Sequence, residues 1–297
     1  MIINKDTLDL VFKGFKSVYT DAYMEAANHA DKIVMRVPSS ARDETYGWLG
    51  QFPQLREWIG DRHIHGLKAH GFTIENREFE STVEVPRNDI MDDRIGVFKP
   101  MFSEMGRLAK SHTQDLVFGL LKSGFDTECF DGQPFFDEDH PLEINKRSAT
   151  VSNMQTGSSA PWFLLDTSRA VRPIIFQERE PYTFEGVTDP EDARVFATGK
   201  YLYGVRARVN AGFGLWQLAF GSKAELNASN YAAARAAMMD FRSDGGRILG
   251  VAPTVLVAPP SLEEKALQLL NATHDASGAT NVWAKTADLV ITPYVKV

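Results

Sequence analysis

The chain has 297 residues, a formal net charge of −7 at pH 7, and 43% hydrophobic and 24% charged residues, a composition typical of globular proteins. The negative charge argues against a protein whose main role is to hold nucleic acid through its phosphates, because that role needs a cationic surface. The single cysteine, Cys129, excludes an internal disulfide and fits a reducing compartment, and no apolar run approaches the about eighteen residues of a membrane span.

The first forty residues predict a helix followed by a short strand. Apolar residues, among them Phe12 and Phe15, recur at intervals of three and four between residues 6 and 27, with Asp6 or Thr7 as the expected N-cap. The segment 32–40 is the predicted strand. The apolar face of the helix must be buried, either against the same chain or against another copy.

Residues 44–85 predict a broad, extended hairpin. Within it, "GWLGQFPQLREWIGDR" combines large apolar side chains with Gly and Pro, which make the segment a poor element of a compact core. Charges of both signs balance around these side chains, as is typical of a protein–protein contact surface; a loop folded onto its own domain is the alternative. The predicted contact residues between subunits are Trp48, Phe52, Leu55, Arg56, Trp58, Ile59 and Arg62, with Phe12 and Phe15 from the first helix.

The strongest helical pattern covers residues 97–123. At 1.5 Å per residue this helix is roughly 40 Å long. A turn-rich loop follows, and the polar segment 145–160 is interpreted as a flexible connection.

The remainder of the chain predicts alternating strands and helices. The expected elements are strands within 162–179 and 200–221, the latter folding back at residues 210–212, a helix at 227–246, a strand near 254–260, a helix opened by the capping box at 261–264, and a final strand at 287–297.

Three groups of residues offer chemistry, each with a plainer alternative. Asp137, Glu138, Asp139 and His140 form a set that a metal-dependent hydrolase or nuclease could use with His63 or His65, but a solvated acidic turn closed by proline is the preferred interpretation. His63 and His65 have a spacing that metal sites can use, but the polar face of an exposed hairpin is preferred. Cys129 has the chemistry of a nucleophile, yet no local signature supports that role and a small buried side chain is preferred. We predict no catalytic residue, no cofactor and no metal.

Several long motifs then resemble one family. The segments "ETYGWLGQFPQLREWIGDR", "VEVPRNDIMDD", "DGQPFFDEDHP", "WFLLDTSR" and "LGVAPTVLVAPPSLE" closely resemble the major head subunit of Mu-like phages and prophages, the gpT family, over nearly the whole chain. The resemblance implies an α+β protein with the tailed-phage major capsid protein fold. Laid on this sequence, it implies an N-terminal arm at 1–41, an extended loop hairpin at 42–85, a peripheral domain at 86–220 with a spine helix at 97–123, and an axial domain at 221–297.

The resemblance also implies the function. The expected protein is a structural major capsid protein, not an enzyme, that self-assembles into hexamers and pentamers of an icosahedral head enclosing double-stranded DNA. Its expected partners are other copies of itself, scaffold and portal proteins during assembly, and DNA contacted without sequence specificity; a decoration protein is a candidate and a membrane is not. The expected locations are the virion and, during assembly, the host cytoplasm. The alternatives are the hydrolase or nuclease described above and a capsid-associated decoration or adaptor protein, which the long helix disfavours.

Overall fold

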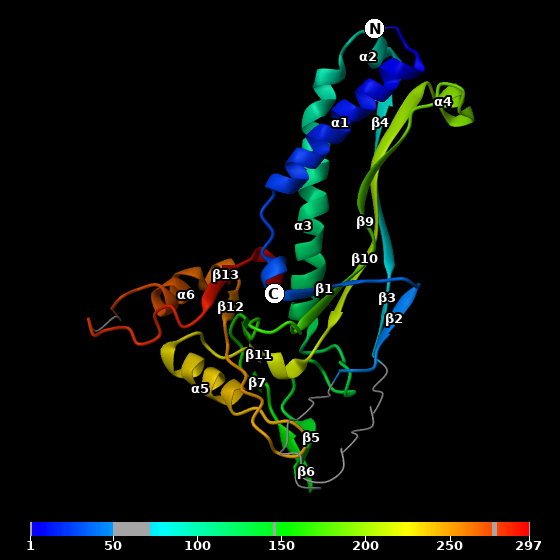
Figure 1. Ribbon diagram of the computed structural model, residues 1–297. Coiled ribbons are helices and arrows are strands. Elements are labelled where there is room, and N and C mark those ends of the chain that lie inside the picture. Colours follow the sequence, from blue (N-terminus) through cyan, green and yellow to red (C-terminus); the bar gives the residue numbers. More distant parts are fainter. Residues whose placement is uncertain (1, 50–71, 145–146, 275–277, 297) are drawn as a thin grey trace.

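The computed structural model describes residues 2–49, 72–144, 147–274 and 278–296 (Figure 1). Its helices are α1 (Lys5–Glu25), α2 (Arg87–Met91), α3 (Lys99–Ser123), α4 (Ala193–Thr198), α5 (Ala228–Met239) and α6 (Glu263–Leu270). Its strands are β1 (Val34–Pro38), β2 (Asp43–Tyr46), β3 (Phe72–Glu75), β4 (Arg77–Pro86), β5 (His140–Ile144), β6 (Arg147–Val151), β7 (Met154–Gln155), β8 (Trp162–Leu165), β9 (Ile174–Val187), β10 (Lys200–Phe213), β11 (Ala219–Ser222), β12 (Val255–Ala258) and β13 (Asp288–Ile291).

A long, narrow sheet and the helix α3 form one end of the molecule (Figure 1). The strand order of this long sheet is β1-β9-β10-β4. Buried and less buried residues alternate along β10, as expected of a strand with one face on a core. The helix α3 runs along that face, and α4 lies at the far tip of the sheet.

The helix α1 crosses α3 and buries Leu8, Val11, Phe15 and Tyr19. Its N-cap is Asn4, not the predicted Asp6 or Thr7: the Asn4 side chain accepts the Thr7 N–H at 2.8 Å, and the Thr7 hydroxyl accepts the Asn4 N–H at 3.0 Å. This reciprocal pair is a capping box, and it satisfies two donors at the helix start.

A second, mixed sheet forms the other end, in the order β13-β12-β8-β11-β7. Every residue of β8, β11 and β12 is buried, because α5 and α6 pack beside this sheet and the end of α3 adjoins it (Figure 1). Both β8 and β11 begin within residues 161–220, so strand pairing divides that stretch between the two sheets.

An aromatic-rich core fills the space between the two sheets. Phe118 and Leu121 of α3, both fully buried, contribute to it, and Phe135 from the following loop stacks on Phe213 of β10 with ring centroids 4.3 Å apart. Within the described part of the chain, no helix combines the length and the hydrophobicity that a bilayer crossing needs.

The predicted turn at residues 210–212 is wrong. The strand β10 continues through them and pairs with β9 as far as Phe213 opposite Ile174. Gly212 does not form a turn but lets β10 pass close to β3, since a Cβ on Gly212 would lie 2.1 Å from the Cδ1 of Ile74. The Asn210 side chain donates to the Glu75 carbonyl at 2.7 Å, so it too is used for packing against β3.

Two other boundaries differ from the predictions. The segment 145–160, predicted to be a flexible connection, contains β6 and β7, which pair with β5 and β11. The helix α5 ends at Met239, not at residue 246. Gly245 and Gly246, with φ of 90° and 84°, form a tight turn between Arg242 and Ile248 instead of a helix terminus.

Candidate functional site

The extended hairpin is anchored by a buried polar network. In the described residues its base is the antiparallel pair β2–β3, with Asp43 opposite Glu75. Gln177 of β9 is fully buried, and its amide donates to the Ile74 carbonyl at 3.1 Å and accepts the Tyr46 hydroxyl at 2.9 Å. Buried polar groups with every partner in place fix one geometry, so this network holds the start and the return of the hairpin against the long sheet.

The predicted contact residues of the hairpin fall largely beyond this base. Trp48 is 36% exposed and meets Tyr46 edge to face, with centroids 6.2 Å apart, whereas its neighbour Leu49 is fully buried. The structure therefore turns the Trp48 ring outward next to an anchored residue. The remaining members and the two histidines lie outside the described residues: Phe52, Leu55, Arg56, Trp58, Ile59, Arg62, His63 and His65.

The structure places the two predicted contact residues of α1 against their own subunit. Phe15 is 2% exposed and stacks on Phe102 of α3 at 4.2 Å. In this arrangement Phe15 is a core residue that offers no surface to a neighbouring copy, because α1 lies on α3. Phe12 is half-buried, with its ring 5.6 Å from that of Phe184.

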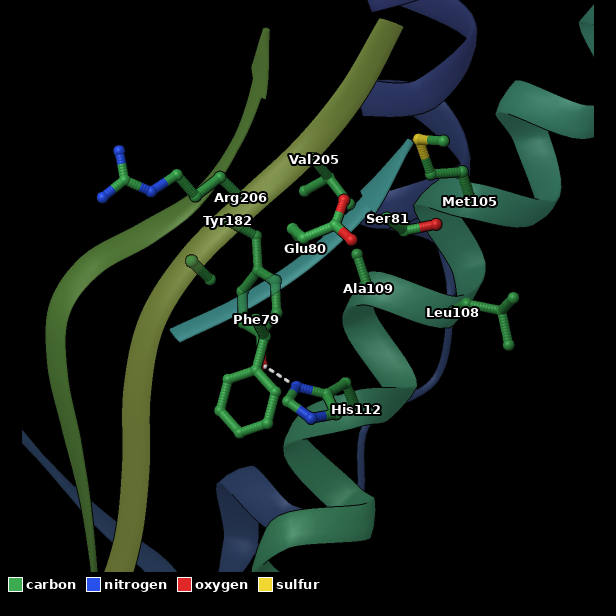
Figure 2. A pocket seen from close by; sticks show the side chains of 11 residues that line it. Phe79, Glu80, Ser81, Met105, Leu108, Ala109, His112, Tyr182, Val205 and Arg206 are labelled. Atoms are coloured by element: carbon green, nitrogen blue, oxygen red, sulfur yellow. Dashed lines mark hydrogen bonds between the residues drawn. The ribbon is translucent and has the colours of Figure 1, made fainter. Parts of the chain in front are cut away.

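A groove between α3 and the long sheet has a volume of about 230 Å³ (Figure 2). His112 reaches from α3 toward the sheet, and its Nδ1 lies 2.7 Å from the Tyr182 hydroxyl of β9. The Phe79 ring meets His112 edge to face at 4.3 Å. Burial lowers the pKa of His112, and the charge of Asp115 opposes that shift only in part. The neutral ring thus joins helix and sheet at the floor of an apolar groove.

Exposed apolar side chains occur elsewhere on the same end of the molecule. Leu108 at the rim of the groove is 51% exposed, and Leu10 of α1 is 64% exposed. Phe196 of α4 is 88% exposed at the tip of the long sheet. The sequence analysis gave Phe196 no role, although an aromatic residue among the charges of "EDARVFATGK" was a usable signal. Single exposed apolar side chains are common on protein surfaces, so none of these three by itself marks an interface.

The acidic set at 137–140 does not converge. Glu138 and Asp139 are exposed, and the Asp137 carboxylate accepts the backbone N–H of Glu138. His140 is fully buried and lies with its Nδ1 2.8 Å from a carboxylate oxygen of Asp131. The predicted alternative of a metal-dependent enzyme built on these four residues therefore has no site in the described structure.

A different group, Cys129, Asp131 and His140, does bring ligand-type atoms within 4.8 Å of one another. These atoms are already paired: the Cys129 thiol donates to Asp131 at 3.1 Å, and His140 contacts both Asp131 and Asn153. Burial raises the pKa of the Cys129 thiol, and the Asp131 charge adds to the shift. The thiol is thus protonated and buried, in agreement with the preferred structural role.

The arrangement as a whole defines a class of protein. A spine-like helix on a long sheet, a second, mixed sheet at the other end and the two-stranded base β2–β3 are features of a phage major capsid protein. The sequence matches the family described as "Mu-like prophage major head subunit gpT" over residues 8–295, and the chain belongs to this family.

Individual relatives agree with this assignment. The major capsid protein of Escherichia phage Mu is 40% identical in an alignment of 289 residues that covers 95% of this chain and 95% of that protein. The subunit of a bacteriophage JBD30 procapsid superimposes with a TM-score of 0.88 at 42% identity, over 98% of this chain and 100% of that one. The subunit of a JBD30 capsid decorated with minor capsid protein trimers gives a TM-score of 0.78 at 31% identity, over 94% and 93%.

The family and the fold confirm the central prediction from sequence. The chain is a structural major head protein of the capsid class, not an enzyme. The predicted capsid fold is likewise confirmed, and the described residues include its long helix α3.

Proposed function

We propose that copies of this chain form the hexamers and pentamers of an icosahedral phage head that encloses double-stranded DNA. The observation that carries the proposal is the match to the JBD30 procapsid subunit over 98% of the chain at a TM-score of 0.88. A subunit held by several neighbours at once gains stability from multivalency even where each contact is weak.

Within the shell, the extended loop at residues 42–85 lies across a neighbouring copy, and the arm at 1–41 supports the same contact. Trp48 supports this role, because its half-exposed ring stands beside the anchored Leu49. Residues 86–220 form the peripheral domain and residues 221–297 the axial domain, with β8 and β11 joining the two through the mixed sheet.

The partners follow from the same role. Assembly takes place in the host cytoplasm with scaffold and portal proteins, and the finished shell contacts DNA without reading its sequence. A decoration protein is a further partner, as suggested by the JBD30 capsid decorated with minor capsid protein trimers. The net charge of −7 is compatible with a shell that encloses DNA but does not grip it.

The experiment compares two adjacent substitutions, Trp48→Ala and Leu49→Ala, in the full chain expressed with its scaffold. Trp48→Ala removes a half-exposed ring, so we expect near-normal urea unfolding but a large loss of shells by sedimentation and negative-stain imaging. Leu49→Ala empties a fully buried site, so we expect the free energy of unfolding to fall by about 2–5 kcal/mol.

Normal shell yield with Trp48→Ala would contradict the loop contact. A wild-type chain that stays monomeric under every condition, with and without scaffold, would contradict the proposed assembly itself.

A further inference from the structure

His140 lies at the centre of a buried cluster formed by Cys129, Asp131, His140, Asn153 and Trp216, named here the His140 cluster. His140 begins β5, and the other members come from the loop after α3, the β6–β7 turn and the short 3-10 helix Trp216–Leu218. The His140 ring is fully buried and stacks on the Trp216 indole, with centroids 4.0 Å apart and planes 8° apart. Three chain segments at the junction of the two sheets therefore meet on one imidazole.

The amide of Asn153 has only one satisfactory orientation. Its Nδ2 donates to the Phe135 carbonyl at 2.8 Å, and its Oδ1 accepts the Asp137 backbone N–H at 2.8 Å. A flipped amide would set donor against donor and acceptor against acceptor, at a cost of about 1–3 kcal/mol for each buried group left unpaired. The atom that faces His140 Nε2 at 3.2 Å is therefore the acceptor Oδ1.

The other ring nitrogen faces a carboxylate. Asp131 Oδ2 lies 2.8 Å from His140 Nδ1, while its Oδ1 accepts the Cys129 thiol and the Gln133 N–H, each at 3.1 Å. Burial alone would raise the pKa of Asp131, but the hydrogen bond and charge of His140, together with the thiol and the N–H, lower it below its ordinary value. Asp131 is ionised and acts as an acceptor on both oxygens.

Both ring nitrogens thus point at acceptors, and a neutral imidazole has only one N–H to give. We propose that His140 is a buried imidazolium ion, and that its second proton holds the loop after α3, the β6–β7 turn and the long-sheet junction together. The facing groups are the Asp131 carboxylate and the Cys129 thiol on the loop, the neutral Asn153 amide on the turn, and the Trp216 ring, whose π-face favours a cation.

The second ring proton has a structural consequence. A ring with a single N–H would leave either the Asp131 contact at 2.8 Å or the Asn153 contact at 3.2 Å without a hydrogen bond. A buried acceptor left unpaired costs about 1–3 kcal/mol. The doubly protonated ring therefore ties the loop after α3 to the β6–β7 turn.

The direct test is nuclear magnetic resonance of the full, unassembled chain labelled with ¹⁵N at histidine. We expect both nitrogens of the His140 ring to carry protons, with protonated-type shifts, at neutral pH. A single N–H on that ring would overturn the proposal. Stoichiometric zinc or another transition metal in the purified protein, lost on Cys129→Ser, would also overturn it, because the metal would then supply the positive charge.

The same spectra of matched variants give a second test. Asp131→Asn offers Nδ1 a donor and satisfies a neutral ring, so the His140 ring of this variant should carry one N–H where the wild type carries two. His112→Gln is the control, because His112 contacts Tyr182 and Phe79 and not the His140 cluster, so it should leave both His140 ring protons in place. Two ring protons on His140 in Asp131→Asn would refute the proposal.

Discussion

The helices α1 and α3 cross at Gly106, where α3 has no room for a side chain. A Cβ at this position would lie 2.3 Å from the carbonyl oxygen of Tyr19 and 3.1 Å from the backbone nitrogen of Tyr23. Gly119 lies in the same helix, and a Cβ there would meet nothing within 4 Å. The variants Gly106→Ala and Gly119→Ala therefore make the same chemical change in two different environments.

The difference in stability between the two variants measures the effect of the close contact between α1 and α3 at Gly106. Alanine is favoured over glycine inside a helix by about 1 kcal/mol, and this gain is common to both. Only Gly106→Ala forces the α1 backbone to retreat by most of an ångström, and such overpacking costs about 1–3 kcal/mol. We expect Gly119→Ala to be more stable than the wild type, and Gly106→Ala to be less stable than Gly119→Ala by about 1–3 kcal/mol.

The assay is urea unfolding of the unassembled subunit, followed by circular dichroism and extrapolated linearly. Hydrogen exchange adds a local readout, because a displaced α1 should lose protection while the Gly119→Ala protein retains it. Equal unfolding midpoints for the two variants would refute the close crossing and the placement of α1 on α3.

Three further outcomes are expected from buried groups. Phe15→Ala should lower the free energy of unfolding by about 3–5 kcal/mol, because the ring is 2% exposed; a loss below about 0.5 kcal/mol would place it at the surface. Burial, with a smaller contribution from Glu44, raises the pKa of Tyr46 from 10.0 to about 12. The contribution of the protonated Tyr46 side chain to stability is therefore complete below about pH 10 and disappears as the pH rises through about 12. Tyr46→Phe should reduce this alkaline loss of stability. An unchanged loss in the variant would contradict the assignment. The raised pKa of buried Cys129 should limit its reaction with iodoacetamide to the rate of opening, so rapid labelling of the native protein would show that the thiol is accessible.

Local periodicity was sufficient for the long helix and the base of the hairpin. The predicted capping box at 261–264 is wrong, because α6 begins at Glu263 without a side-chain cap. The long helix was predicted at 97–123 and begins at Lys99 and ends at Ser123, because its apolar positions repeat over seven turns of sequence with little interruption. The pairing of β2 with β3 was likewise visible from alternation in the returning strand. In both cases the signal lies in residues close together in the chain.

The predictions that were wrong concern residues whose conformation depends on contacts with segments far away in the sequence. Asn210, Ala211 and Gly212 have the composition of a turn, but eleven register pairs with β9 keep β10 extended through them. From the sequence, His140 was grouped with the acidic residues 137–139, whereas in the structure it contacts Asp131, Asn153 and Trp216. No spacing rule joins those four residues, because they meet only after both sheets have formed.

The mixed sheet also sets the order in which a newly made subunit can be completed. Residues 163–165 of β8 pair with residues 255–257 of β12, and β12 then pairs with β13 at residues 288–291. During synthesis, β8 can first pair with β11 at residues 219–222, but its other edge stays open until residues 255–257 are made, and β12 keeps an open edge until residues 288–291 are made. A polypeptide terminated before residue 288 would retain that open edge, which another chain could pair with in place of β13.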